Sequence, residues 1–301
     1  MEHNALVVVR GGGDIATGSI WKLRQCGFRV LVLETAHPPA IRRTVAFSEA
    51  VYHGRQTVEG MTCRLAKDLP EAQRLLASEG LAMLVDPMGT CIPQVQPLAV
   101  VDAILAKRNL GTHRGMGAIT VALGPGFTAG VDCDAVIETN RGHRLGRVIY
   151  DGQAEPNTGV PGVIQGYGRE RVIHSPAAGI LRSCRGITDI VRKGDLLAEV
   201  ETPEGRMPVP ATMDGLLRGM LPEGFPVTMG LKMADIDPRI QEHDNCFTIS
   251  DKARCIAGGV LEAILHLSEE HKEEQAYGAH CETEICGGIH QRGADRAGVR
   301  G

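Results

Sequence analysis

The residues best suited to chemistry stand near the beginning of the sequence, in the run Gly11-Gly12-Gly13-Asp14-Ile15-Ala16. This spacing fits the G-x-G-x-x-G/A pattern, in which the first glycine makes a tight turn and the second lets the backbone approach a pyrophosphate. A helix that starts there offers free N–H groups and a partial positive charge. Asp14 would repel a phosphate unless it caps the helix or binds a metal. We predict that a phosphate-bearing cofactor binds at Gly11, Gly13, Asp14, Ala16, Thr17 and Gly18.

Charged residues after the next apolar run extend this candidate site. Glu34 closes the run Val30-Leu31-Val32-Leu33, and an acidic residue there binds a ribose 2′-hydroxyl, which favours an NAD-like over an NADP-like ligand. Arg42 and Arg43 could clamp a phosphate or a carboxylate between two guanidinium groups. Two alternatives stay open: the pair is a solvated basic surface, or the fold no longer binds a nucleotide.

A second glycine-rich loop, residues 124–130, follows another apolar run. Loops after parallel strands lie at the carboxyl edge of a sheet, where ligands bind. Gly124 and Gly126 are therefore predicted to approach the cofactor, and Arg141 to neutralise its charge. Glu138 and His143 are the candidate catalytic residues, because a carboxylate and an imidazole can move protons near neutral pH. A structural turn that carries surface charges is the alternative.

The cysteines indicate the redox compartment of the protein and do not point to a catalytic or metal site. There are nine, an odd and scattered set that suits a reducing cytosol better than a disulfide framework. Cys133 lies between Asp132 and Asp134, whose negative charges make a thiol less nucleophilic, so we interpret it as structural. The Cys and His residues after Glu269 are spaced too loosely for a zinc site, and we predict no metal site.

Composition argues against several kinds of partner. The formal net charge is -4 and the pI is about 6.3, so no basic field attracts nucleic acid or an anionic membrane. Aromatic residues make up 3%, too few for the stacking platforms that bind single strands. No apolar run approaches the ~20 residues that cross a bilayer. The first residues have no signal-peptide pattern, so we expect a cytoplasmic protein.

Alternating elements must position these residues. Apolar runs at 5–9 and 30–33 flank an amphipathic helix that ends near Gly27, which predicts a βαβ unit. Further strands are expected at 81–85, 119–123 and 135–137, and helices at 70–78 and 98–106. We predict an α/β fold, with a Rossmann-like parallel sheet domain over residues 1–165.

Residues 166–240 follow a different pattern of short apolar stretches between glycines and prolines. Gly179-Ile180-Leu181-Arg182 is echoed 36 residues later by Gly215-Leu216-Leu217-Arg218. The repeat predicts an inserted small all-β domain like the barrel-sandwich hybrid of biotinyl and lipoyl carriers. The turn between the halves, residues 201–206, contains no carrier lysine. A C-terminal helix over 241–268 should dock on the α/β domain, and 269–301 should form a disordered tail.

Several stretches together resemble one family. They are residues 10–18, Ala40–Val45, Val101–Asn109, Gly124–Phe127, Val136–His143, Leu231–Arg239 and Ile249–Arg254. The chain resembles, before Glu269, the YqeB-type accessory proteins of selenium-dependent molybdenum hydroxylases. It is also similar to the XdhC-type proteins that help to insert molybdenum cofactor into xanthine dehydrogenase. The resemblance implies a role in maturing or inserting a molybdopterin-type cofactor, and it supplies no mechanism.

Three functions are compatible with these observations. The favoured one is a non-catalytic accessory protein that holds an NAD-like nucleotide or a molybdopterin-type cofactor at the glycine loop. Its partners would be the molybdenum hydroxylase apo-enzyme or other maturation proteins, and it could form a homo-oligomer. The first alternative is an NAD-dependent oxidoreductase with His143 as proton donor. The second is an interaction protein with a vestigial nucleotide fold.

Overall fold

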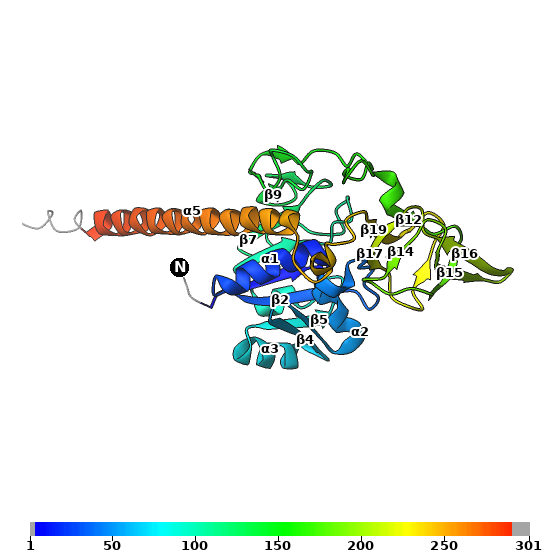
Figure 1. The fold of residues 1–301 in the computed structure, drawn as a ribbon. Coiled ribbons are helices and arrows are strands. Elements are labelled where there is room, and N and C mark those ends of the chain that lie inside the picture. The colour runs from blue at the N-terminus through cyan, green and yellow to red at the C-terminus, as the bar shows by residue number, and fades with distance from the viewer. Residues whose placement is uncertain (1–3, 291–301) are drawn as a thin grey trace, which may run out of the picture.

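The larger part of the molecule is built on one nine-stranded sheet (Figure 1). The structure, a computed structural model, describes residues 4–290, with side chains described as far as His271. Strand order across the sheet is β10-β9-β7-β6-β1-β2-β5-β4-β3. The central strands are β1 (Leu6–Arg10), β2 (Arg29–Glu34), β5 (Leu81–Val85), β6 (Ala99–Asp102), β7 (Ile119–Leu123) and β9 (Ala135–Ile137). These six strands pair in parallel with one another.

Antiparallel strands close both edges of this sheet. At one edge β3 (Arg55–Val58) pairs antiparallel with β4 (Met61–Ala66), and at the other β10 (Val148–Ile149) pairs antiparallel with β9. The helices beside the sheet are α1 (Asp14–Gln25), α2 (Ala50–His53), α3 (Leu69–Ser78) and α4 (Ile92–Val95). A small separate ladder joins β8 (Thr128–Ala129) to β11 (Gly152–Gln153).

The predicted fold class, a Rossmann-like parallel sheet domain with an inserted barrel-sandwich-hybrid-like domain, is wrong. The sheet is large and mixed, with antiparallel strands at both edges. The predicted helix over 98–106 is also wrong, since β6 lies there with all four of its residues buried between β1 and β7. A short apolar run buried on both faces has no distinguishing period, and the paired valines favour a strand. The helix predicted over 70–78 is confirmed as α3.

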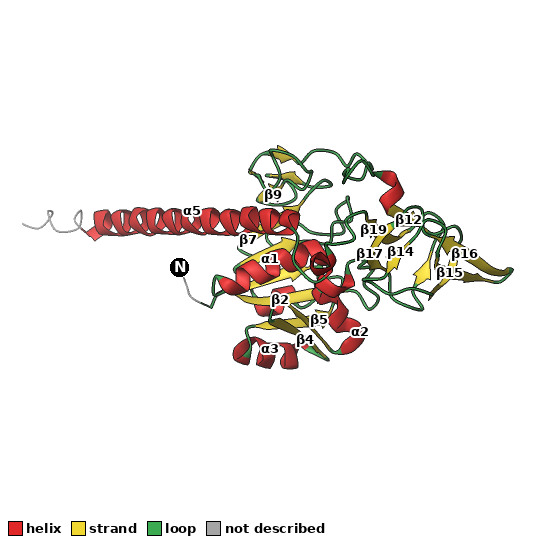
Figure 2. Ribbon diagram, in the orientation of Figure 1, coloured by secondary structure: helices red, strands yellow, loops and turns green. Residues whose placement is uncertain are grey.

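Two four-stranded antiparallel sheets form the β-region that Figures 1 and 2 show at the end of the molecule away from the chain's N-terminus. One has the order β12-β19-β17-β14, with β12 (Val172–His174), β14 (Ile190–Val191), β17 (Gly215–Met220) and β19 (Lys232–Asp237). The other has the order β16-β15-β13-β18, with β13 (Gly179–Ser183), β15 (Leu196–Thr202), β16 (Gly205–Pro210) and β18 (Pro226–Val227). They share one apolar core, which includes Leu181, Leu217 and Ile236.

The last helix, α5 (Asp251–His290), packs its first turns against the sheet and α1. Ala253, Ile256, Val260 and Ile264 are buried there. The helix passes residue 268, where a disordered tail was predicted to begin, because the following Glu, Lys, Gln and Ala residues are good helix formers. Residues 291–301 of that predicted tail, and the side chains of its Cys and His residues after His271, lie outside the described residues.

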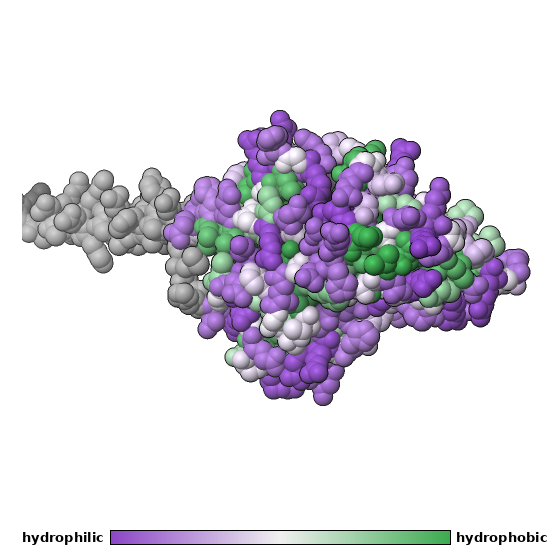
Figure 3. Space-filling view, in the orientation of Figure 1, coloured by the Kyte–Doolittle hydropathy of each residue, from purple (hydrophilic) through white to green (hydrophobic). Residues whose placement is uncertain are grey.

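The surface in Figure 3 is mainly hydrophilic, with an apolar area over the sheet that contains β17 and β19. Among the described residues, no helix is both long enough and apolar enough to span a bilayer.

Candidate functional site

The glycine loop lies at the carboxyl end of β1 and lines a cavity of about 870 Å³, here called the glycine-loop cavity. Gly11 makes the turn with φ +93°, and a Cβ there would lie 2.9 Å from the carbonyl oxygen of Ala103. At Gly12 a Cβ would meet the Ser48 backbone nitrogen at 3.1 Å. Gly13 differs, since a Cβ there would have no atom within 4 Å and its φ is -63°. The packing of the chain therefore does not explain why residue 13 is glycine.

Glu34 lines the same cavity and holds the loop in place. Its Oε1 accepts the Gly12 N–H at 2.7 Å, and its Oε2 accepts the Thr35 N–H at 2.8 Å. Burial raises the pKa of this carboxyl, and the two backbone hydrogen bonds oppose that rise. Each carboxylate oxygen thus accepts a backbone N–H, which holds the glycine loop against the end of β2, and the predicted contact of Glu34 with a ribose stays a prediction.

Asp14 and Arg42, which also line the cavity, are paired with one another. A terminal nitrogen of Arg42 lies 3.4 Å from Asp14 Oδ2, so the negative charge of Asp14 is compensated. The other terminal nitrogen donates to the carbonyl oxygens of Asn245 at 2.9 Å and Thr248 at 3.2 Å, while Nε has no hydrogen-bond partner within residues 4–271. Burial, followed by the positive charge of Arg218, lowers the pKa of Arg42. Arg42 therefore links the glycine loop to the segment before α5.

Four other predicted residues serve internal packing. Ala16 and Thr17 are fully buried, and the Thr17 hydroxyl donates to the Gly12 carbonyl and accepts the Phe47 N–H. A Cβ at Gly18 would lie 2.8 Å from Ala253, so this glycine allows α1 and α5 to touch. Arg43 donates to the Met220 carbonyl and pairs with Glu49, outside the cavity lining.

The second glycine-rich loop is a structural turn. Gly124 has φ +77° and Gly126 has φ +107°, a conformation that favours glycine. A Cβ at Gly124 would lie 2.5 Å from Thr139 Oγ1, and one at Gly126 would lie 2.6 Å from the Arg108 nitrogen. Both glycines are accounted for by the turn, without a ligand.

The structure does not bring the two candidate catalytic residues together. Glu138 is 2% exposed, and its carboxylate accepts the N–H groups of Asn140 and Glu155. His143 is exposed and does not line the glycine-loop cavity. Cys133 is fully buried, and burial together with Asp132 and Asp134 raises its pKa to about 12.

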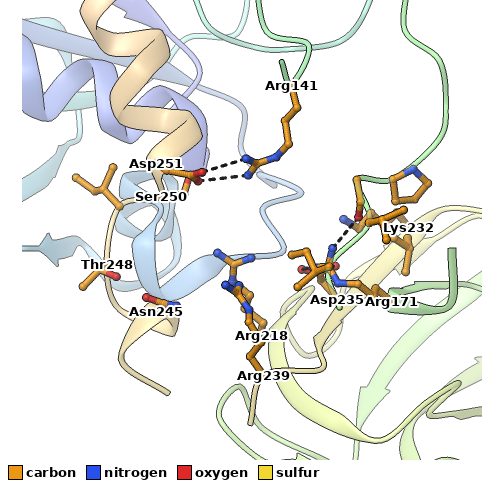
Figure 4. Close-up of a pocket in the computed structure, with 16 residues that line it drawn as sticks. Arg141, Arg171, Arg218, Lys232, Asp235, Arg239, Asn245, Thr248, Ser250 and Asp251 are labelled. Carbon is orange, nitrogen blue, oxygen red and sulfur yellow. Dashed lines mark hydrogen bonds and ion pairs between the residues drawn. The ribbon is translucent and has the colours of Figure 1, made fainter. Parts of the chain in front are cut away.

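A strongly basic cavity of about 570 Å³, here called the arginine cavity, lies between the β-region and the start of α5 (Figure 4). Arg141 was predicted as a site residue, and it pairs there with Asp251 at 3.0 Å. Sequence reasoning missed the other cations that line it, namely Arg171, Arg218, Lys232 and Arg239. Two of them, Lys232 and Arg239, belong to the stretch 231–239 that carries part of the family resemblance, and the charges of this stretch are the sequence signal for the cavity.

A single lysine connects the cavities. Lys232, at the start of β19, lines the glycine-loop cavity, the arginine cavity and a third cavity of about 830 Å³ that also contains Lys252. Within the described part of the chain, the side chain of Lys232 has no hydrogen-bond or ion-pair partner. The cavities thus adjoin one another along the boundary between the sheet and the β-region. Between residues 4 and 271, no group of three or more His, Cys, Asp or Glu side chains could hold a metal ion.

No protein-family model matches the chain. Solved structures that are similar include a succinylglutamate desuccinylase/aspartoacylase from Rhodobacter sphaeroides, with 13% identity and a TM-score of 0.26 over 77% of this chain and 85% of that one. Another is the ectoine utilization protein EutE (DoeB) from Ruegeria pomeroyi, with 10% identity and a TM-score of 0.24 over 77% of this chain and 86% of that one. Scores this low carry no argument about function.

One curated protein gives a much closer match. The chain is 52% identical over 266 residues to the uncharacterized protein YqeB of Escherichia coli K12, a match that covers 88% of this chain and 48% of that protein. The chain therefore spans about half the length of the relative that it matches. Over most of its own length, this chain is a homologue of that YqeB protein.

Proposed function

We propose that this chain binds a phosphate-bearing cofactor, an NAD-like nucleotide or a molybdopterin-type cofactor, in the glycine-loop cavity. We further propose that it does so as an accessory protein in the maturation of a selenium-dependent molybdenum hydroxylase. The hydroxylase apo-enzyme, or another maturation protein, would receive the cofactor.

The observation that carries the binding proposal is the open space at Gly13. This residue is the N-cap of α1, it lines the cavity, and a Cβ there would have no atom within 4 Å. The N–H groups of the first helical turn, residues 14–16, have no partner within the helix and carry its positive dipole end. A phosphate can approach such a terminus closely only where no side chain intervenes. The pairing of Asp14 with Arg42 removes the repulsion that Asp14 would otherwise exert.

The accessory role is favoured over an enzyme by what surrounds the cavity. Its two lining carboxylates, Asp14 and Glu34, are engaged with Arg42 and with backbone N–H groups. His143, the candidate proton donor of an oxidoreductase, lies on the exposed surface and outside the cavity lining. The link to a hydroxylase rests on the family resemblance of the sequence alone.

Calorimetric titration with NAD, NADP and molybdopterin dinucleotide tests the proposal, with Gly13→Asp as the variant. Aspartate is a favourable N-cap residue, so this change should preserve α1 while placing a negative charge where the phosphate would bind. Gly186→Asp is the matched control, because Gly186 is exposed and a Cβ there also has no atom within 4 Å.

We expect binding of the pterin dinucleotide or of NAD by the wild type and by Gly186→Asp, and its loss in Gly13→Asp. Equal affinity in all three proteins, or no binding of any of the three ligands, would contradict the proposed site. Turnover of NADH that depends on His143 would contradict the accessory role and establish the oxidoreductase instead.

A further inference from the structure

The two sheets of the β-region are copies of one arrangement, related by an offset of 36 residues. Ile180 pairs with Glu201 in one sheet, and Leu216 pairs with Asp237 in the other. Glu199 pairs with Pro208 in one sheet, and Asp235 pairs with Val172 in the other. Glu199 and Asp235 are 36 residues apart, and so are Val172 and Pro208. The same offset also relates the two strand orders, so each position in one sheet has a counterpart in the other. The copies therefore allow a direct comparison of equivalent residues.

Arg182 and Arg218 are equivalent, but their charges are compensated differently. Arg182 lies 2.7 Å from Glu201 and 3.4 Å from Glu223, so two carboxylates face it. Arg218 lies 3.8 Å from Asp237, the counterpart of Glu201. The residue at the offset from Glu223 is Ile187, which has no charge.

Asp237 is also shared with a second arginine. Arg239 binds both oxygens of this carboxylate, at 2.9 and 2.8 Å. The Arg218 side chain is 14% exposed, and its Nε has no hydrogen-bond partner among the residues that the structure describes. Arg218 is thus a largely buried guanidinium with one distant, shared carboxylate.

Three more cations at the arginine cavity have no charged counterpart in the other copy. Arg171, Lys232 and Arg239 stand where the other sheet has Met207, Leu196 and Pro203, respectively. All three point toward one cavity rather than being spread over the surface. The fold of the β-region does not require these charges, since the other copy forms the same pairings without them.

The remaining wall of the arginine cavity comes from the part of the molecule that contains the nine-stranded sheet. Figure 4 shows Arg141 reaching in from one side and Arg218 with Arg239 from the opposite side. Five cations gather here with three carboxylates, those of Asp235, Asp237 and Asp251, which leaves a surplus of two positive charges. A partly enclosed surplus of this kind is costly without a counter-ion, because the surrounding protein screens charge less than water does.

We propose that the arginine cavity is a binding site for a dianionic oxoanion of the phosphate class, separate from the glycine-loop cavity. Guanidinium groups bind such anions through paired N–H donors, and the unpartnered Nε of Arg218 supplies one of them. The two surplus cations match two negative charges. The proposal goes beyond the proposed function and does not depend on it, because Lys232 alone lines both cavities.

Calorimetric titration of the full chain with inorganic phosphate at low ionic strength tests this site. Arg218→Gln removes the under-compensated guanidinium, while Asp237 keeps both of its bonds from Arg239. Arg182→Gln, at the equivalent position of the other copy, is the matched control. Arg141→Gln is a second variant that should fold readily, since its side chain is 53% exposed. Acetate serves as a singly charged comparison.

We expect Arg218→Gln and Arg141→Gln each to weaken phosphate binding about tenfold or more, as loss of one charge-assisted contact implies, and Arg182→Gln to leave it unchanged. Acetate should bind more weakly than phosphate. Equal phosphate affinity in Arg218→Gln and Arg182→Gln would overturn the proposal, as would the absence of phosphate binding by the wild type. Gly13→Asp separates the two sites, since phosphate binding in the arginine cavity should survive in that variant whatever happens to the cofactor.

Discussion

Two adjacent glycines in α5 should respond to the same substitution with opposite signs. Gly258 is exposed, and a Cβ there would meet no atom within 4 Å. Gly259 is buried, and its Cβ would lie 2.1 Å from the carbonyl oxygen of Gly146 and 3.0 Å from a methyl group of Ile137. The perturbation is therefore one methyl group placed at two neighbouring positions of one helix.

The expected magnitudes follow from helix propensity and from overlap. Alanine is better than glycine in a helix by about 1 kcal/mol, so Gly258→Ala should raise the free energy of unfolding by about that amount. Gly259→Ala gains the same propensity, but carbon and oxygen normally stay roughly 3.3 Å apart even in close contacts. Gly146 cannot yield easily, because its φ is +78° and its N–H is bonded to the Glu138 carbonyl at 2.9 Å. Overpacking costs about 1–3 kcal/mol, and at its upper end Gly259→Ala becomes about 2 kcal/mol less stable than the wild type.

Urea denaturation followed by circular dichroism measures both changes. The two variants should differ by about 3 kcal/mol, with the wild type between them. If both variants were stabilised, α5 would not rest against the Gly146 turn. That outcome would also remove the support for the wall of the arginine cavity, where Arg141 meets Asp251.

Three further predictions concern buried charges and thiols. Arg10→Leu should lower the free energy of unfolding by about 3–5 kcal/mol at pH 7, because it leaves the buried carboxylate of Asp102 (1% exposed) without its cation. The loss, measured by urea denaturation, should shrink as the pH falls, since burial raises the pKa of Asp102 and the carboxyl becomes neutral. Burial alone would raise the pKa of Asp237, but hydrogen bonds from Arg239 outweigh it and lower the pKa below 3.8. The stability from that pair is therefore complete above pH 3.8 and is lost as the pH falls through the pKa of Asp237 in the folded protein. Asp237→Asn should make the free energy of unfolding fall less steeply at acid pH, and an unchanged pH dependence would refute this. Cys133 should not react with iodoacetamide in the native protein at pH 8, because burial raises the pKa of its thiol to about 12. Mass spectrometry of the peptides measures the reaction, and rapid modification would contradict the burial of this side chain.

Much of the local structure could be predicted from the sequence. The continuous apolar run before Arg10 is a strand buried on both faces, with Val7, Val8 and Val9 fully buried. Gly11 makes a turn that needs a positive φ. The run at 99–102 could not be identified, because a short buried segment has no period that separates strand from helix.

The candidate site could be predicted only in part. Gly11, Gly13, Asp14, Glu34 and Arg42 do line one cavity. Gly18 and Thr17 belong to the same stretch, yet they serve contacts with Ala253 and Phe47, and a sequence pattern does not distinguish a glycine that faces a ligand from one that faces a helix. His143 and Glu138 are five residues apart, but one is exposed and the other buried.

The sequence by itself determined most of the short-range features: the strands at 5–9, 30–33, 81–85, 119–123 and 135–137, the turn at Gly11, and the recurrence of residues 179–182 after 36 positions. Those features depend on residues that are close together in the chain, so their propensities and spacing can be read directly from the sequence. Only the tertiary structure decided that the sheet is mixed and that Arg141 lies in one cavity with Arg218 and Lys232. Such convergence depends on how distant segments pack and on which carboxylate compensates each charge, and neither is encoded in local spacing.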